Sequence, residues 1–70
     1  MKRPLTKRQQ EVLDFITKFI AMNKIPPTAA EIAERFKFAN PSGAQTHLAA
    51  LIAKGAISIY ERTARGIVVL

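Results

Sequence analysis

Hydrophobic residues recur every three or four positions along the first third of the chain, which is the spacing of one face of an α-helix. The positions are Val12, Phe15, Ile16, Phe19 and Ile20. Thr6 followed by Gln9 is a capping-box pattern, in which the two side chains bond free backbone amides reciprocally. The pattern predicts a helix over about residues 7–22. Asn23 suits the left-handed conformation that ends a helix, and the prolines at 26 and 27 favour extended backbone beyond it.

A second, shorter amphipathic segment follows the prolines. Thr28 and Glu31 repeat the capping-box spacing. The apolar residues of this segment keep a helical period: Ala29, Ile32, Ala33 and Phe36. The pattern predicts a helix over about residues 29–37. The polar residues that it predicts to face solvent are Glu31, Glu34, Arg35 and Lys37.

The sequence around Asn40 predicts the start of a third helix after a very short connection. Asn is a preferred N-cap, and Pro41 at the first helical position loses no hydrogen bond there. Gly55 suits the C-terminal stop, so this helix is predicted over about residues 41–54. Two helices joined by about three or four residues form a helix-turn-helix.

After Gly55 the hydrophobic period changes from that of a helix to the alternation of β-strands. β-Branched residues predict strands over about 57–60 and 67–70, and the charged segment between them suits a hairpin tip. A lone hairpin is marginally stable in water, so we expect it to pack on the helices. The predicted fold is mainly α with a small β-hairpin: a three-helix winged helix-turn-helix over residues 1–70 as a single domain.

The outward face of the third predicted helix is small and uncharged. On a helical wheel, the side predicted to be buried consists of Ala44, Leu48, Leu51 and Ile52. On the far side lie Ser42, Thr46, Ala49, Ala50 and Ala53, with Gly43 and Gln45 on the flanks. Such a face fits a DNA major groove about 12 Å wide, with Ser42, Gln45 and Thr46 placed to touch base edges. An ordinary alanine-rich helix, chosen for helix propensity, is the alternative interpretation.

The charge of the chain favours a polyanionic partner. Eleven Lys and Arg against five Asp and Glu give a net charge of +6 in 70 residues. For a small folded domain this basic, nucleic acid is the commonest polyanion, although the same charge also serves solubility. The residues predicted to contact DNA phosphates are Lys2, Arg3, Lys7, Arg8, Lys54, Arg62 and Arg65.

Other classes of function find little support in the sequence. No serine or threonine has a base partner at a catalytic spacing, so an enzyme is not expected. His47 is the only histidine and cysteine is absent, so we expect no metal site and no cofactor. No apolar run reaches the length of a membrane span, and the lack of cysteine fits a reducing compartment. We therefore expect a cytoplasmic protein that is not associated with a membrane.

Several fragments, in order and at matching spacing, resemble the amino-terminal domain of LexA repressors. They are the run from Leu5 to Val12, Pro26-Pro27-Thr28 with Glu31-Ile32-Ala33, Ala44 to Leu48 with Leu51, Lys54-Gly55, and Arg65-Gly66-Ile67. The resemblance implies a bacterial, nucleoid-associated transcriptional repressor of the DNA-damage response that binds a palindromic operator as a homodimer. It also implies a second domain with a serine–lysine self-cleavage site, which supplies the dimer interface and is not part of these 70 residues. A homodimer of this chain is then expected only on DNA or through that missing domain.

The departures from the LexA pattern bear on specificity. The resemblance adds Asn40 and Gly43 to the base-reading set, which becomes Asn40, Ser42, Gly43, Gln45 and Thr46. The best-known relatives carry two adjacent acidic residues where Gln45 and Thr46 stand. Carboxylates accept from the cytosine amino group, whereas Gln suits adenine and Thr suits a thymine methyl. We therefore expect a half-site that differs from the family's CTGT-type sequence.

One alternative from another class is a winged-helix protein–protein module whose basic face meets an acidic partner. Its signature would be an exposed apolar patch, and only alanines lie outside the predicted core. Salt-dependent binding to random duplex DNA would separate the two functions.

Overall fold

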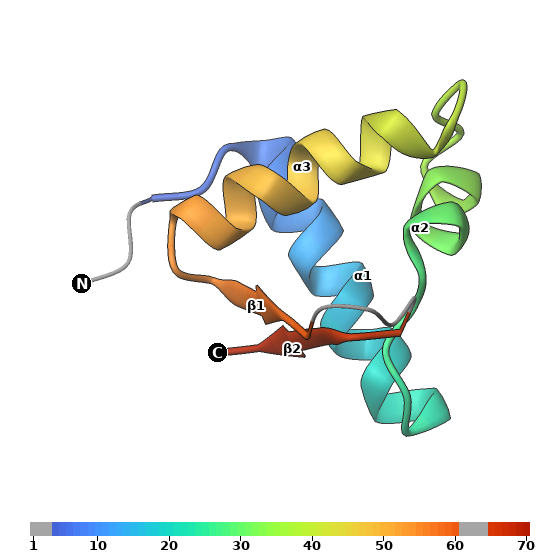
Figure 1. The fold of residues 1–70 in the computed structure, drawn as a ribbon, viewed down its shortest axis with the longest axis vertical. Coiled ribbons are helices and arrows are strands. Elements are labelled where there is room, and N and C mark those ends of the chain that lie inside the picture. The colour runs from blue at the N-terminus through green and yellow to red at the C-terminus, as the bar shows by residue number, and fades with distance from the viewer. Residues whose placement is uncertain (1–3, 61–64) are drawn as a thin grey trace.

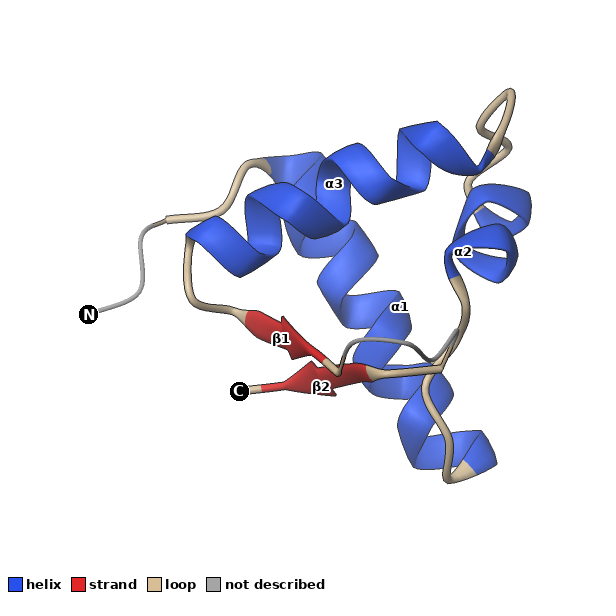
Figure 2. Cartoon of the chain, viewed as in Figure 1, coloured by secondary structure: helices blue, strands red, loops and turns tan. Residues whose placement is uncertain are grey.

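The structure is a computed structural model that describes residues 4–60 and 65–70. Three helices come first: α1 (Lys7–Asn23), α2 (Ala29–Arg35) and α3 (Pro41–Ala53). The strands β1 (Ile57–Ile59) and β2 (Ile67–Val69) follow and pair antiparallel, with Ile57 opposite Val69 (Figure 1, Figure 2). This order confirms the predicted winged helix-turn-helix.

Both predicted capping boxes are present. The Thr6 hydroxyl accepts from the Gln9 amide at 3.2 Å, and the Gln9 side chain accepts from the Thr6 amide at 3.1 Å. At the start of α2, Thr28 and Glu31 make the same pair of bonds at 3.1 and 2.8 Å. Each box satisfies backbone donors that have no partner inside the helix, so it fixes where the helix begins.

The ends of α1 and α2 differ from the prediction by one and two residues. Lys24, with φ 65°, takes the left-handed conformation assigned to Asn23, whose side chain instead donates to the Phe19 carbonyl at 3.0 Å. Helix α2 ends at Arg35 and not near residue 37, because Lys37 itself is left-handed with φ 58°. The Phe38 amide then bonds the Ala33 carbonyl at 2.8 Å, which closes the helix end.

Helix α3 ends at the stop that Gly55 predicts, one residue before the predicted Lys54. Gly55 has φ 75°, and the next amide, of Ala56, donates to the Leu51 carbonyl at 2.9 Å. These are the features of a Schellman end, so the last helical residue is Ala53. Both strands are one residue shorter than predicted, ending at Ile59 and Val69.

The core lies where the three helices meet the hairpin. Its buried residues are Val12, Ile16, Ile32, Ala33, Ala44, Leu48, Leu51, Ala56, Ile57 and Ile67. Figure 1 shows α3 crossing α1, with the hairpin below α3. In the described ranges, every helix is too short or too polar to span a bilayer.

The prediction that Ile52 is buried was wrong. Its side chain is 44% exposed, whereas Leu48 is 5% exposed. Ile52 lies about 40° further round the helix than Leu48, on the flank that faces the hairpin. Ala50, predicted to point outward, is half-buried. The wheel therefore found the centre of the buried face but misplaced its edges.

Candidate nucleic-acid interface

The turn between α2 and α3 is built around Phe38. Its ring stacks on His47 of α3, with centroids 5.3 Å apart and planes at 18°, and on Phe36 at 5.9 Å and 19°. A Cβ atom on Gly43 would lie 3.1 Å from the Phe38 Cβ, a closer approach than side chains ordinarily make. Glycine at 43 therefore lets the first turn of α3 sit against Phe38. His47 is therefore a partly buried residue that packs on Phe38.

The N-terminal turn of α3 is held by its own polar side chains. The Asn40 side-chain oxygen accepts from the Ser42 amide at 3.0 Å, and Pro41 is in the first turn. The Thr46 hydroxyl donates to the Ser42 carbonyl at 3.0 Å. That bond commits the hydroxyl proton to the helix, so the Thr46 methyl group is left as the apolar contact.

The exposed face of α3 carries most of the predicted base-reading residues. Ser42, Gln45 and Thr46 are exposed, and Asn40 is exposed just before the helix. Gly43 differs because it is half-buried against Phe38. Ala49 and Ala53 continue the exposed face toward the C-terminus. The structure thus brings together Ser42, Gln45 and Thr46 at one end of an exposed face of small, uncharged residues.

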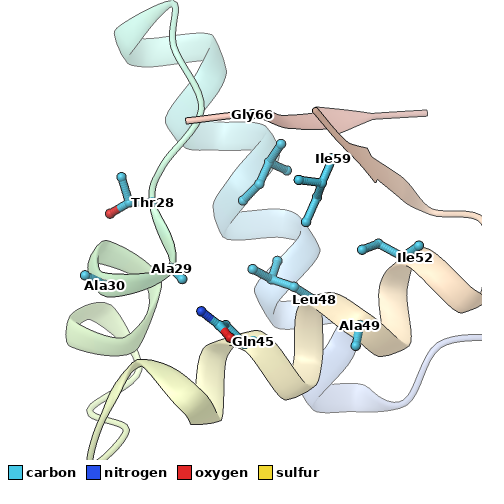
Figure 3. Close-up of a pocket in the computed structure, with 10 residues that line it drawn as sticks. Thr28, Ala29, Ala30, Gln45, Leu48, Ala49, Ile52, Ile59 and Gly66 are labelled. Atoms are coloured by element: carbon cyan, nitrogen blue, oxygen red, sulfur yellow. The ribbon is translucent and has the colours of Figure 1, made fainter. Parts of the chain in front are cut away.

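A groove lies beside this face, between α3, the start of α2 and the hairpin. Its volume is about 500 Å³, and it is lined mostly by apolar residues. Figure 3 shows Gln45 reaching into it from α3, while Ile52 and Ile59 approach it from α3 and β1. The sequence does not predict this groove, because the helical period places Ile52 in the core. It is the kind of exposed apolar surface that the protein–protein alternative requires.

Basic residues gather where the end of α3 meets the start of α1. The Lys54 Nζ atom lies 2.6 Å from the Gln9 Oε1 atom, so Lys54 sits beside the first turn that carries Lys7 and Arg8. Arg8 pairs with Glu11 at 3.3 Å and lies over the Phe36 ring, 5.5 Å from its centroid. Lys2, Arg3 and Arg62, also predicted to contact phosphates, lie outside the described residues.

Arg65 is placed differently from the other predicted phosphate contacts that the structure describes, Lys7, Arg8 and Lys54. Its guanidinium donates to both carboxylate oxygens of Glu31, at 2.7 and 3.0 Å, and to the Pro26 carbonyl at 3.0 Å. The Arg65 bonds, followed by the bond from the Thr28 amide, lower the pKa of Glu31 from 4.5 to about 2. Glu31, which was predicted to face solvent, is 36% exposed and is paired with Arg65. The pairing joins residues 34 positions apart, which periodicity does not reveal.

Comparison with known proteins agrees with this geometry. The profile of the LexA DNA binding domain matches residues 2–66. LexA repressors from Azoarcus sp. (strain BH72) and Aromatoleum aromaticum are 54% and 53% identical over 63 and 64 residues, which is 90% and 91% of this chain. The LexA repressor of Shewanella amazonensis is 52% identical over 65 residues, or 93% of the chain. The chain spans about a third of these relatives' length, 31–32%. It belongs to the LexA DNA-binding domain family.

Proposed function

We propose that this domain binds a specific double-stranded DNA operator by placing α3 in the major groove. The exposed polar end of α3, on the second helix of a helix-turn-helix, is the observation that carries the proposal. Ser42, Gln45 and Thr46 read base edges, and Asn40 does so from just before the helix. Gly43 lets the first turn of α3 pack against Phe38, and this contact holds the neighbouring polar residues of α3 in their exposed position.

Phosphate contacts come from the basic residues at the junction of α1 and α3. Lys7, Arg8 and Lys54 would meet one stretch of backbone, and Lys2, Arg3 and Arg62 are assigned to phosphates from the sequence alone. Phosphate contacts set the register of α3 on the duplex without reading its sequence. The net charge of +6 supports a strong salt dependence.

The half-site is proposed to differ from the CTGT-type sequence of the family. Within the described part of the chain, the Gln45 side-chain amide makes no hydrogen bond, so it is available for paired contacts to adenine. The Thr46 hydroxyl is bonded to Ser42, which favours contact of its methyl group with a thymine methyl. Neither residue is a carboxylate, and both would lose the cytosine contact that acidic residues make.

Repression is proposed to be steric, in that the bound domain occludes a promoter without chemistry on the DNA. The operator would be palindromic and occupied by two copies, joined on DNA or through a further domain. One small module makes few contacts, so its binding alone is expected to be weak.

A binding-site selection on random duplex DNA tests the proposal. We expect a domain tethered as a dimer to select a palindrome, and the isolated domain to select the same half-site more weakly. Gln45→Ala should weaken binding to the selected site by about 5- to 150-fold, as expected for about 1–3 kcal/mol, and relax the preference at one position. Gln10→Ala is the matched control, since Gln10 is exposed on α1 and bonds Asp14.

The same series separates the protein–protein alternative. A DNA-binding domain binds random duplex with an affinity that falls steeply as salt rises. If the domain does not bind random duplex at low salt, the proposed DNA binding is contradicted. If it selects the unmodified CTGT palindrome, the proposed change of half-site is contradicted. The family match favours DNA over the alternative.

A further inference from the structure

Arg65 joins three segments that are far apart in the sequence. It lies at the start of the return arm of the hairpin, directly before Gly66 and Ile67, which are both buried. Its Nη1 atom donates to the Glu31 Oε1 atom at 2.7 Å and to the Pro26 carbonyl at 3.0 Å, and its Nη2 atom donates to Oε2 at 3.0 Å. The tip end of the hairpin, where the loop enters β2, is therefore tied both to α2 and to the connection before it.

The carboxylate that receives Arg65 is already held in place. The Glu31 Oε1 atom also accepts from the Thr28 amide at 2.8 Å, and the Thr28 hydroxyl accepts from the Glu31 amide at 3.1 Å. Because the capping box already fixes the Glu31 side chain, little rotamer freedom is left to lose when Glu31 pairs with Arg65. A two-point contact between a planar guanidinium and a fixed carboxylate sets direction as well as distance.

The pair contributes more to geometry than to global stability. The two side chains are 40% and 36% exposed, and ion pairs at such sites stabilise folded proteins little. Yet a two-stranded hairpin takes its orientation from whatever it packs on. Here β1 packs on α3, and the Arg65 pair holds the other arm against the N-terminus of α2.

We propose that Arg65 is a positioning residue that acts through Glu31 to set the hairpin relative to the helix-turn-helix, and is not a phosphate contact. This inference rests on the proposed function, because the hairpin and α3 must meet the same duplex. It replaces the assignment of Arg65 to the phosphate backbone made from charge alone.

A phosphate contact and a positioning role for Arg65 predict opposite effects on DNA affinity when Glu31 is made neutral. Removal of an acid raises the net charge of a DNA-binding domain, and by charge alone that strengthens binding to DNA. If Glu31 positions the hairpin, its neutral analogue should weaken binding to the operator despite the gain in charge. Glu31→Gln suits the test because Gln also completes a capping box, so α2 keeps its start.

The experiment measures operator affinity at several salt concentrations for four variants of this chain. They are Glu31→Gln, Arg65→Lys, Arg65→Ala and the double variant Glu31→Gln/Arg65→Lys. We expect each single variant to lose about 3- to 10-fold in affinity, with the salt slope unchanged. The double variant should lose no more than either of its single variants, because both substitutions remove the same interaction. Arg65→Lys keeps the charge but not the two-point contact, so it should behave like Arg65→Ala.

Glu34→Gln is the matched control. Glu34 lies on the same helix and is exposed, and its side chain has no hydrogen bond or ion pair within the described ranges. We expect it to bind DNA as well as the parent or better. The inference would be overturned if Glu31→Gln bound as Glu34→Gln does, or if Arg65→Ala lowered the salt slope by about 0.9 while Arg65→Lys retained it, the signature of a phosphate contact.

Failure of this inference is distinct from failure of the proposed function. If the parent chain selects no DNA sequence, the proposed function fails. If the parent selects a site and the four variants bind it as the parent does, the positioning role alone fails. Circular dichroism at the binding temperature shows that each variant is folded; a pair that served stability only would leave the affinity of folded protein unchanged.

Discussion

The Nζ atom of Lys54, the residue after α3, lies 2.6 Å from the Oε1 atom of Gln9 in the first turn of α1. The same oxygen accepts from the Thr6 amide at 3.1 Å, so a capping box serves as the docking point for a distant basic side chain. Glu31 and Arg65 repeat this relationship at α2. In both cases the residue at the third helical position joins the start of a helix to a later part of the chain.

The first prediction concerns this capping residue of α1. Gln9→Glu should raise the free energy of unfolding by about 0.5–1 kcal/mol, since a carboxylate bonds Lys54 more strongly and suits a helix N-terminus. Urea denaturation measures the change. Gln10→Glu is the control, because Gln10 bonds Asp14 and an added charge there meets a like charge. The explanation is wrong if Gln9→Glu stabilises the Lys54→Met variant as much as it stabilises the parent chain, and by no more than Gln10→Glu does.

The second prediction concerns the contact between Gly43 and Phe38. Alanine in a helix is favoured over glycine by about 0.5–1 kcal/mol, but here its Cβ would crowd Phe38. Gly43→Ala should therefore stabilise the Phe38→Gly variant, which lacks the crowding Cβ, more than it stabilises the parent chain. The four proteins of this double-mutant cycle are compared by thermal unfolding, and equal effects in both backgrounds would show that the contact carries no cost.

The third prediction is a pH dependence. The pKa of Glu31 is about 2 in the folded protein and 4.5 is its ordinary value, so the folded state favours the ionised carboxylate. Its contribution to stability is fully present above about pH 5 and is lost as the pH falls toward 2. The stability difference between the parent and Glu31→Gln should be constant near neutral pH and shrink over that interval.

The partner of Glu31 provides the control for this titration. Arg65 is the largest cause of the lowered pKa, and the bond from the Thr28 amide remains without it. In an Arg65→Ala background the stability difference that Glu31→Gln makes should therefore be smaller and complete its loss at a higher pH. Denaturation at a series of pH values measures both. If the loss of this stability difference at low pH is the same in that background as in the parent, the Arg65 bonds are not made in solution.

Local signals predicted most of the fold. Thr6, Thr28 and Asn40 marked the helix starts, because capping depends on residues a few positions apart. Gly55 marked the end of α3 because a left-handed residue is ordinarily glycine. Lys37 makes the equivalent turn after α2 without such a signature, so that helix was predicted too long.

The site was less predictable because its edges depend on tertiary packing. Ile52 lies between the buried and exposed sides of a wheel, and only the position of the hairpin decides that it lines a groove. The charge of Arg65 suggested DNA, whereas the structure gives it Glu31 as a partner. A pairing across 34 residues leaves no trace in hydrophobic periodicity.

The last prediction concerns how Thr46 takes part in the proposed reading of DNA. Its hydroxyl donates to the Ser42 carbonyl, so its methyl group should make the base contact. Thr46→Val keeps a methyl in that place and should retain operator affinity within about 3-fold, whereas Thr46→Ser keeps the hydroxyl and should lose about 5- to 10-fold. Replacing the contacted thymine by uracil, which lacks the C5-methyl group, should weaken the parent and leave Thr46→Ser unaffected. If Thr46→Ser bound as the parent does and Thr46→Val did not, the hydroxyl would be the reading group, and the bond to Ser42 would have to open on DNA.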